Sequence, residues 1–289
     1  MERDNRRPWQ EPNLWVPVLA ITAVIGAALF FWPMGEKSKE PVKEETTATS
    51  PDDLLSHEQA EEPKIQFPVP GEAGETAGAI TQSPGENTQQ HPSLDESDAF
   101  IEEEFHHLYD EQKFGGLFLL QDIIRNSVVT IDNMTGPKLP QKYSFTQPPA
   151  GRFVVFRDAA GNEFIDPKNY DRYRTFVELA MAVDIRRIVS FYVRYYTAFQ
   201  QAYRDLGYPD RYFNDRVIAV LDHLLAAPEI KVPIKLVRPK VFYQFADPDL
   251  EALSAGQKIL VRIGPDNAGK VKARLKELRQ SLATLKKKK

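Results

Sequence analysis

The Asp222-His223 pair is the strongest candidate for chemistry in this sequence. Asn214-Asp215 completes the constellation on the same predicted helix. Asp215 precedes Asp222 by seven residues, so the two aspartates share one face of that helix. A carboxylate beside His223 could orient the imidazole as a general base. The same residues also suit a structural role, in which Asp215 pairs with Arg211 and His223 packs among apolar neighbours. Because no nucleophile accompanies the pair, we predict no catalytic residue and keep Asp215 and His223 as candidate binding residues.

Histidine also follows glutamate near the start of the predicted domain. Glu102 with His106, and Glu103 with His107, are i,i+4 pairs that can bind a metal ion weakly. Adjacent helical side chains point about 100° apart, so the two histidines cannot serve one site and we interpret them as solvated surface. The chain has no cysteine, and it contains no glycine-rich phosphate loop, nucleophile elbow or His-Glu-x-x-His motif. The sequence therefore predicts neither a metal nor a cofactor.

Aromatic and basic residues in the middle of the chain are a second group of candidates. A stripe at helical spacing consists of Ile185, Ile188, Tyr192, Tyr195, Phe199, Tyr203 and Leu206. This pattern predicts a helix that faces the core, and a glycan-stacking platform is the alternative. Arg187 and Arg194, seven residues apart around Phe191, are candidates for a cationic contact face, with solvated surface as the alternative. Tyr208, just after the stripe, completes the candidate binding residues.

The N-terminal region predicts a membrane anchor. Residues 14–32 include no charged side chain, and this length is close to the roughly 20 residues that cross the bilayer. Trp15 and Trp32 flank the run as interfacial aromatic side chains do. A cleaved signal peptide is the alternative, but no small-residue cleavage site follows. Three basic residues flank the run on each side, so the distribution of positive charge does not decide the orientation. The short N-terminal tail, residues 1–13, is more easily left inside the cell than the long C-terminal part. We therefore expect an inner-membrane protein with a periplasmic domain.

Residues 33–93 have the composition of a linker. They contain 12 acidic residues, 4 basic residues and eight prolines, and we find no apolar period in them. Such a segment buries too little apolar surface to offset its chain entropy. We therefore expect a disordered linker that acts as an inert tether.

Residues 94–289 carry the periodicity of a folded domain. Predicted helices span residues 94–109, 117–134, 170–184, 185–206, 211–226, 247–263 and 267–285, and short extended pieces span 152–156, 163–165, 232–237 and 241–245. This order predicts a mainly α fold, or an α+β fold, with one or two small β-hairpin elements.

The last predicted helix has the features of an interaction element. Its apolar residues form a narrow seam of Val271, Leu275, Leu278, Leu282 and Leu285. Residues 270–289 also contain nine basic side chains against Glu277 alone. Packing of the seam on its own domain is the first expectation, and self-association is the alternative. The basic face and the tail Lys286–Lys289 could contact anionic lipid or a cell-wall polymer.

Several short motifs resemble those of one known family. They are Leu94–Asp98, Thr130–Asn133, Gly151–Phe153, Leu206–Asp210, Tyr212–Asp215, Ala246–Pro248 and Leu253–Lys258. In this order the chain resembles, over about Leu94 to Leu285, the bacterial membrane-anchored family labelled domain of unknown function 3014. The resemblance implies one N-terminal span, a variable Pro-rich spacer and this domain. It implies no activity, so no catalytic residue is carried over.

These features predict a single-span protein whose tethered helical domain is a binding or scaffold module at the cell envelope. An envelope hydrolase that uses a carboxylate and His223 is one alternative, and a cytoplasmic-facing membrane adaptor is another. Expected partners are the membrane, a protein or second copy at the C-terminal helix, and an anionic surface. Nucleic acid is disfavoured, because residues 94–269 carry 21 basic against 25 acidic side chains.

Overall fold

The computed structural model describes residues 65–70, 94, 98, 100–101, 111–229 and 231–285. The predicted anchor (14–32), the Glu-His pairs at 102–107 and the lysine tail (286–289) lie outside these residues. Across the described ranges, no helix combines the length and the apolar character that a membrane crossing requires.

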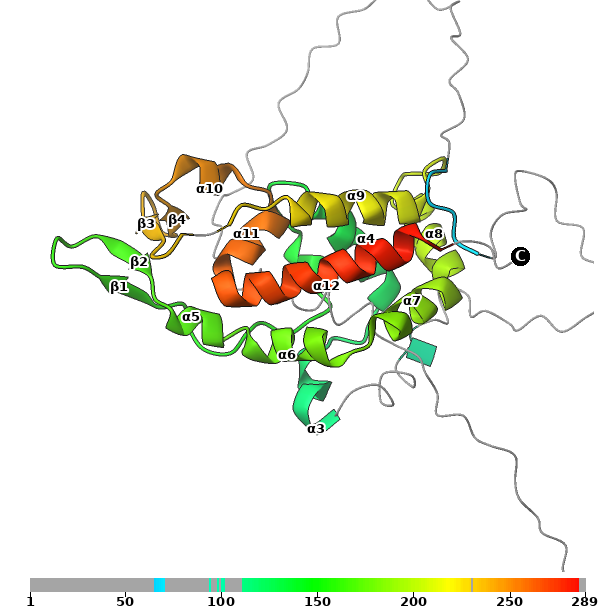
Figure 1. The fold of residues 1–289 in the computed structure, drawn as a ribbon, viewed down its shortest axis with the longest axis horizontal. Helices are drawn as coiled ribbons and strands as arrows, with labels where there is room; N and C mark the ends of the chain where they lie inside the picture. Colours follow the sequence, from blue (N-terminus) through cyan, green and yellow to red (C-terminus); the bar gives the residue numbers. More distant parts are fainter. Residues whose placement is uncertain are drawn as a thin grey trace, which may run out of the picture.

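The described part is mainly helical with one small antiparallel sheet, which confirms the coarse fold class (Figure 1). The α-helices are α3 (Glu111–Phe114), α4 (Ile123–Asn133), α5 (Lys168–Asp171), α6 (Arg174–Ala182), α7 (Ile185–Arg194), α8 (Tyr196–Asp205), α9 (Phe213–Leu225), α10 (Pro248–Ala252), α11 (Ala255–Arg262) and α12 (Pro265–Ala283). Two short 3-10 helices, η1 (Gly115–Leu117) and η2 (Gln141–Tyr143), lie on either side of α4 in the chain. The strands are β1 (Val155–Arg157), β2 (Glu163–Ile165), β3 (Lys235–Val237) and β4 (Gln244–Phe245).

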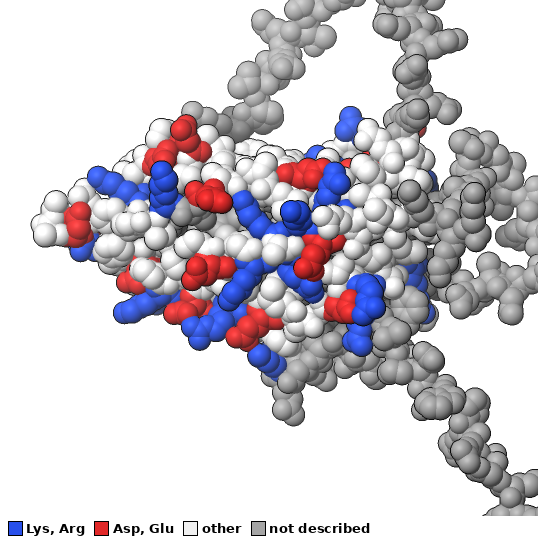
Figure 2. All heavy atoms as spheres, viewed as in Figure 1, with Lys and Arg blue, Asp and Glu red and all other residues white. Residues whose placement is uncertain are grey.

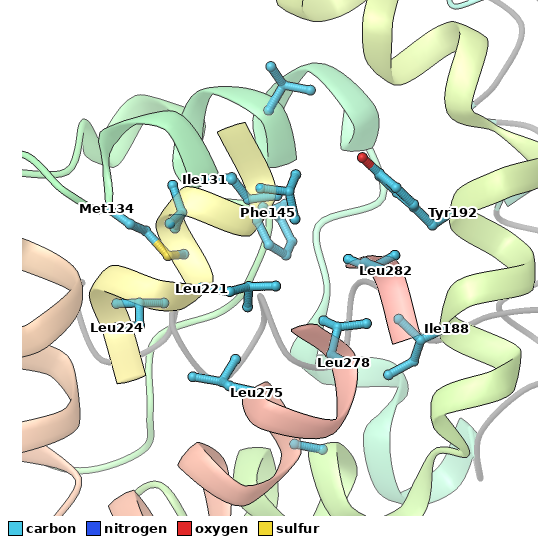
Figure 3. Packing of buried hydrophobic residues seen from close by; sticks show 14 of the residues in the cluster. Ile131, Met134, Phe145, Ile188, Tyr192, Leu221, Leu224, Leu275, Leu278 and Leu282 are labelled. Carbon is cyan, nitrogen blue, oxygen red and sulfur yellow. The ribbon is translucent and has the colours of Figure 1, made fainter. Parts of the chain in front are cut away.

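Helix α12 lies at the centre of the helical part. It runs between α9 on one side and α6 and α7 on the other (Figure 1). The seam residues Val271, Leu275, Leu278 and Leu282 are all buried, and Figure 3 shows the three leucines near Leu221 of α9 and Ile188 of α7. The predicted packing on the parent domain is confirmed, so the apolar face that suggested self-association is already occupied.

The aromatic stripe is core, but it does not lie on one helix. Tyr192, Tyr195, Phe199 and Tyr203 are buried, which excludes an exposed stacking platform at these positions. The predicted single helix over 185–206 is wrong, because Tyr195 leaves helical geometry and separates α7 from α8. Leu206 ends the stripe and is 37% exposed.

The helix predicted at 117–134 starts later than the periodicity indicates. Phe118 forms a β-bridge with Thr146, and Leu119 donates its N–H to the Phe145 carbonyl. These contacts hold residues 118–121 out of the helix, and α4 begins at Ile123. The carboxylate of Asp98 accepts the N–H groups of Asp122 and Ile123. A residue outside α4 therefore caps its first turn.

The extended pieces form one sheet instead of separate hairpins. Its strand order is β1-β2-β3-β4, antiparallel throughout. A second, smaller core lies under this sheet and contains Ile165, Ile234, Leu236, Phe245 and Val261. Because Val261 belongs to α11, the sheet is attached to the helices through that element.

The helix predicted at 247–263 is also divided. Leu253 and Ser254 separate α10 from α11 because both take extended backbone angles. Ser254 accepts the N–H of Gln257 and so caps α11. The first N–H groups of α11 reach the turn that follows α4: Ala255 donates to the Gly136 carbonyl and Gly256 to the Met134 carbonyl. A Cβ on Gly256 would meet Leu224 at 2.5 Å and the Met134 oxygen at 2.9 Å, so only glycine fits this crossing.

Candidate functional site

A short segment of the predicted linker is docked on the helical domain. Residues 65–70, with the sequence Ile-Gln-Phe-Pro-Val-Pro, lie beside α8 and the N-terminal end of α9 (Figure 1). Val69 is buried to 1% exposure and Phe67 packs partly buried against the main core. Gln66 and Pro68 are exposed. The expectation of a disordered linker is therefore wrong for these six residues.

Polar side chains at the start of α9 hold the backbone of this segment. The Asp215 carboxylate accepts the N–H of Gln66 at 3.0 Å and the N–H of Phe67 at 2.8 Å. Tyr212 Oη accepts the N–H of Val69 at 2.8 Å. Asn214 Nδ2 donates to the Phe67 carbonyl at 2.8 Å. Pro68 has no N–H, so every backbone donor from residue 66 to residue 69 has an acceptor.

A buried network positions these three side chains. Gln200 of α8 accepts the hydroxyl of Tyr196 at 3.1 Å and the N–H of Phe213 at 2.8 Å. The Tyr196 hydroxyl in turn accepts the N–H of Asn214. Burial raises the pKa of Tyr196, so its hydroxyl stays protonated and can act as donor and acceptor together. Side chains of α8 thus satisfy the free N–H groups that begin α9, and this fixes the Tyr212–Asp215 turn.

Tyr208 supports the same region but does not contact the segment in any described interaction. Its hydroxyl donates to Asp132 Oδ2 at 3.2 Å, and its ring stacks on Tyr203 at 4.7 Å. Arg216 donates to Asp132 Oδ1 at 2.7 Å and to Thr135. This cluster ties α9 to the end of α4. Tyr208 is accordingly a structural residue of the site's framework.

In the part of the chain that the structure describes, Asp222 does not contact the His223 imidazole as predicted. Both oxygens of Asp222 accept from Arg279 of α12, at 2.8 and 2.9 Å. Asp215 binds residues 66 and 67 at the other end of α9, and the predicted Asp215–Arg211 pair does not form. The hypothesis that a neighbouring carboxylate orients His223 is therefore wrong. Each of the three residues has a different partner.

His223 instead lies 2.8 Å from Ser254, measured between Nε2 and Oγ. Both line an open pocket of about 470 Å³ with Thr135, Pro137, Asp249, Ala252, Leu253 and Gln257. A Ser–His contact can serve nucleophilic catalysis, which also needs N–H donors for the developing oxyanion. Here Ser254 caps α11, and the first three N–H groups of α11 already have acceptors. Gln257 also donates to the His223 carbonyl. These hydrogen bonds connect α9 to the start of α11, which is a structural role.

The basic residues of α12 are largely used inside the fold. On the face shown in Figure 2, Lys and Arg side chains gather where α12 runs, with acidic side chains among them. Arg274 donates to the carbonyl of Ala180 in the last turn of α6 and to that of Val183, which follows α6. Lys272 donates to the Ala227 carbonyl after α9. Cations at these helix ends complement the helix dipoles. The predicted basic contact face is thus smaller than the sequence indicates.

Arg187 and Arg194 are not brought to either site. Phe191, which they were expected to flank, is fully buried. Arg194 lies over the ring of Tyr195 at 5.8 Å. In the interactions described for residues 111–285, neither arginine contacts Asp215, His223 or segment 65–70. Their role as a cationic contact face stays a prediction.

Sequence reasoning named Tyr212 and Asn214 without giving either a binding role, and it missed the docked segment. One signal was present: Ile65, Phe67 and Val69 alternate with other residues, and a two-residue period is typical of extended chain that buries one side. The spacing alone does not say where such a segment binds. Of the predicted binding residues, Asp215 is the one that contacts it.

A family model described as protein of unknown function (DUF3014) matches residues 123–279, just over half of the chain. The match runs from the start of α4 to α12 and is narrower than the range of Leu94 to Leu285 that the motifs indicate. It includes Tyr212–Asp215, whereas segment 65–70 lies outside it. The comparisons with curated proteins and with solved structures gave no match.

Proposed function

This chain belongs to the family of proteins of unknown function DUF3014, and on that premise we propose that it is a binding module anchored at the cell envelope. The anchor is the apolar run at residues 14–32 and the working part is the helical domain. The binding site is the surface formed by Tyr212, Asn214 and Asp215. The observation that carries the proposal is segment 65–70, seated on that surface through its backbone.

The site has the composition of a peptide-recognition surface. It offers acceptors to N–H groups, a donor to a carbonyl, and two positions for apolar side chains, one buried and one half-buried. Main-chain hydrogen bonds supply affinity in such sites and the buried side chains supply specificity. A hydrolase is the weaker candidate, because the groups around His223 are already engaged in joining α9 to α11.

The proposal includes a location in the membrane. We expect the full chain to sediment with membranes and to resist alkaline carbonate extraction, since roughly 20 apolar residues suffice to span a bilayer. Deletion of residues 14–32 is the matched control and should move the protein to the soluble fraction. A soluble full-length chain, or a mature protein that begins after Trp32, would contradict the anchor. A reporter enzyme fused after Lys289 separates a periplasmic domain from a cytoplasmic-facing adaptor.

The remaining partner proposals concern charge. The lysine tail at 286–289, with the exposed Lys270 and Lys276 of α12, is proposed to contact anionic lipid or an anionic cell-wall polymer. Such a contact weakens as ionic strength rises. Nucleic acid is not proposed.

The peptide site is tested by Asp215→Ala in the full chain. This change removes the acceptor of two N–H groups, and a hydrogen bond to a charged group contributes about 1.5–3 kcal/mol. We therefore expect the amides of Gln66, Phe67 and Val69 to exchange at least about tenfold faster, while α9 keeps its protection. Hydrogen exchange read by mass spectrometry measures both.

Asp210→Ala is the control for that experiment. Asp210 is exposed, and its replacement changes the net charge equally while leaving the acceptors of the segment in place. Its segment amides should exchange as in the wild type. Unchanged exchange in Asp215→Ala would mean that the carboxylate does not hold the segment, and the proposed site would be lost.

A further inference from the structure

The contacts of segment 65–70 are made mostly to groups that any extended chain carries. Three N–H groups and one carbonyl make the hydrogen bonds. Of the side chains, only Val69 is fully buried, Phe67 is half-buried, and Ile65 remains 51% exposed. The site therefore selects an extended backbone that carries two apolar side chains, two positions apart. Nothing in these contacts restricts it to this one segment.

The segment also fits the site incompletely. Asn214 is fully buried, and among the described residues its Oδ1 atom has no hydrogen-bond donor. A buried acceptor without a donor costs free energy. The occupant present thus leaves one polar group of the site unsatisfied. A better-matched chain could gain what this one does not.

Position 68 defines the chemistry of the occupant. The N–H groups on both sides of this position have acceptors in Asp215 and Tyr212, and Pro68 itself is exposed. Proline at that position leaves no donor without a partner and holds φ near the extended value. The class that suits the site is an extended peptide with the order apolar, Pro, apolar.

We propose that segment 65–70 is a built-in competitor at a peptide site, and that the site's other occupant is an extended apolar-Pro-apolar segment of a partner protein. The inference rests on the proposed function, whose site it uses. Because the segment is tethered, its effective concentration at the site is high, and the partner must displace it. If the segment fills the site nine-tenths of the time, the apparent Kd of the partner rises about tenfold.

The test uses the full chain in detergent and a labelled synthetic peptide with the sequence of residues 63–71. Val69→Asp removes the buried side chain of the competitor and leaves the site intact. We expect this variant to bind the peptide at least about tenfold more tightly than the wild type does. Adding Asp215→Ala to it should abolish that gain. A peptide with Asp at the position of Val69 is the matched control and should not bind.

A second measurement covers the case in which Val69→Asp unfolds the domain. Excess isotope-labelled peptide added to the wild type should accelerate hydrogen exchange at the chain's own Gln66, Phe67 and Val69 amides. If Asp215→Ala releases the segment but neither peptide measurement responds, the segment is a permanent structural part and this inference fails alone. If the Val69→Asp and Asp215→Ala chains associate with each other as strongly as the peptide binds, the occupant is a second copy, which also overturns it.

Discussion

Leu275→Asp is expected to unfold the domain. Leu275 lies at the middle of the α12 seam with 0% exposure, packed where α12 meets α6, α7 and α9. Truncation of a buried leucine to alanine alone costs about 2–5 kcal/mol. A carboxylate at the same position adds the cost of a buried, unpaired polar group, several kcal/mol more. The total is comparable with the 5–15 kcal/mol that stabilises a typical domain.

Urea denaturation followed by far-UV circular dichroism measures this effect. Lys276→Asp is the control, because Lys276 is exposed on the same helical turn and surface changes usually stay within about 0.5 kcal/mol. We expect no cooperative transition for Leu275→Asp and a nearly unchanged midpoint for Lys276→Asp. A Leu275→Asp chain that unfolds at the wild-type midpoint would mean that the seam is not packed as described.

The seam and the aromatic stripe could be predicted because burial imposes the period of the helix on the sequence. Leu275 and Leu278, like Tyr192 and Phe199, recur at the spacing that places them on one face. The same periodicity does not reveal where a helix stops. At Tyr195, and at Leu253 and Ser254, the apolar pattern continues across a break in the backbone.

Those breaks arise from contacts that are distant in sequence. At the break between α10 and α11, Ala255 and Gly256 donate their N–H groups to carbonyls that follow α4. The late start of α4 follows from the bridge between Phe118 and Thr146. Tertiary hydrogen bonds of this kind override local propensity. The spacing of apolar residues contains no information about these contacts.

The candidate site shows the same limit. Asp215 was predicted as a binding residue, but its partners, Gln66 and Phe67, precede it by almost 150 residues. Asp222 and His223 are adjacent in sequence, yet one pairs with Arg279 and the other with Ser254. Adjacent helical side chains diverge, so proximity in sequence gave the wrong pairing. The composition of residues 33–93 is acidic and Pro-rich, and this average does not reveal the alternation of Ile65, Phe67 and Val69.

Gly264→Ala is the second change with a large expected effect. Gly264 joins α11 to α12 with φ +87° and ψ 160°, a region that residues other than glycine occupy at a cost of about 1–3 kcal/mol. A Cβ there would also lie 2.5 Å from Cγ of Tyr170 and 2.7 Å from its ring carbons. Tyr170 lies in α5, which follows β2 in the sequence, and it packs against the small core beneath the sheet. Overpacking of this kind costs about 1–3 kcal/mol, so the expected loss is about 2–6 kcal/mol.

Gly161→Ala separates the two causes of that loss. Gly161 has φ +80° in the β1–β2 turn, and a Cβ there would meet nothing within 4 Å. Its replacement should therefore cost only the backbone strain, about 1–2 kcal/mol. Urea titrations of both variants, and of Gly264→Ala combined with Tyr170→Ala, form a double-mutant cycle. Removal of the Tyr170 ring should recover at least about 1 kcal/mol of the Gly264→Ala loss. Strictly additive losses would mean that the ring and the glycine do not touch, and that the sheet is joined to the helices elsewhere.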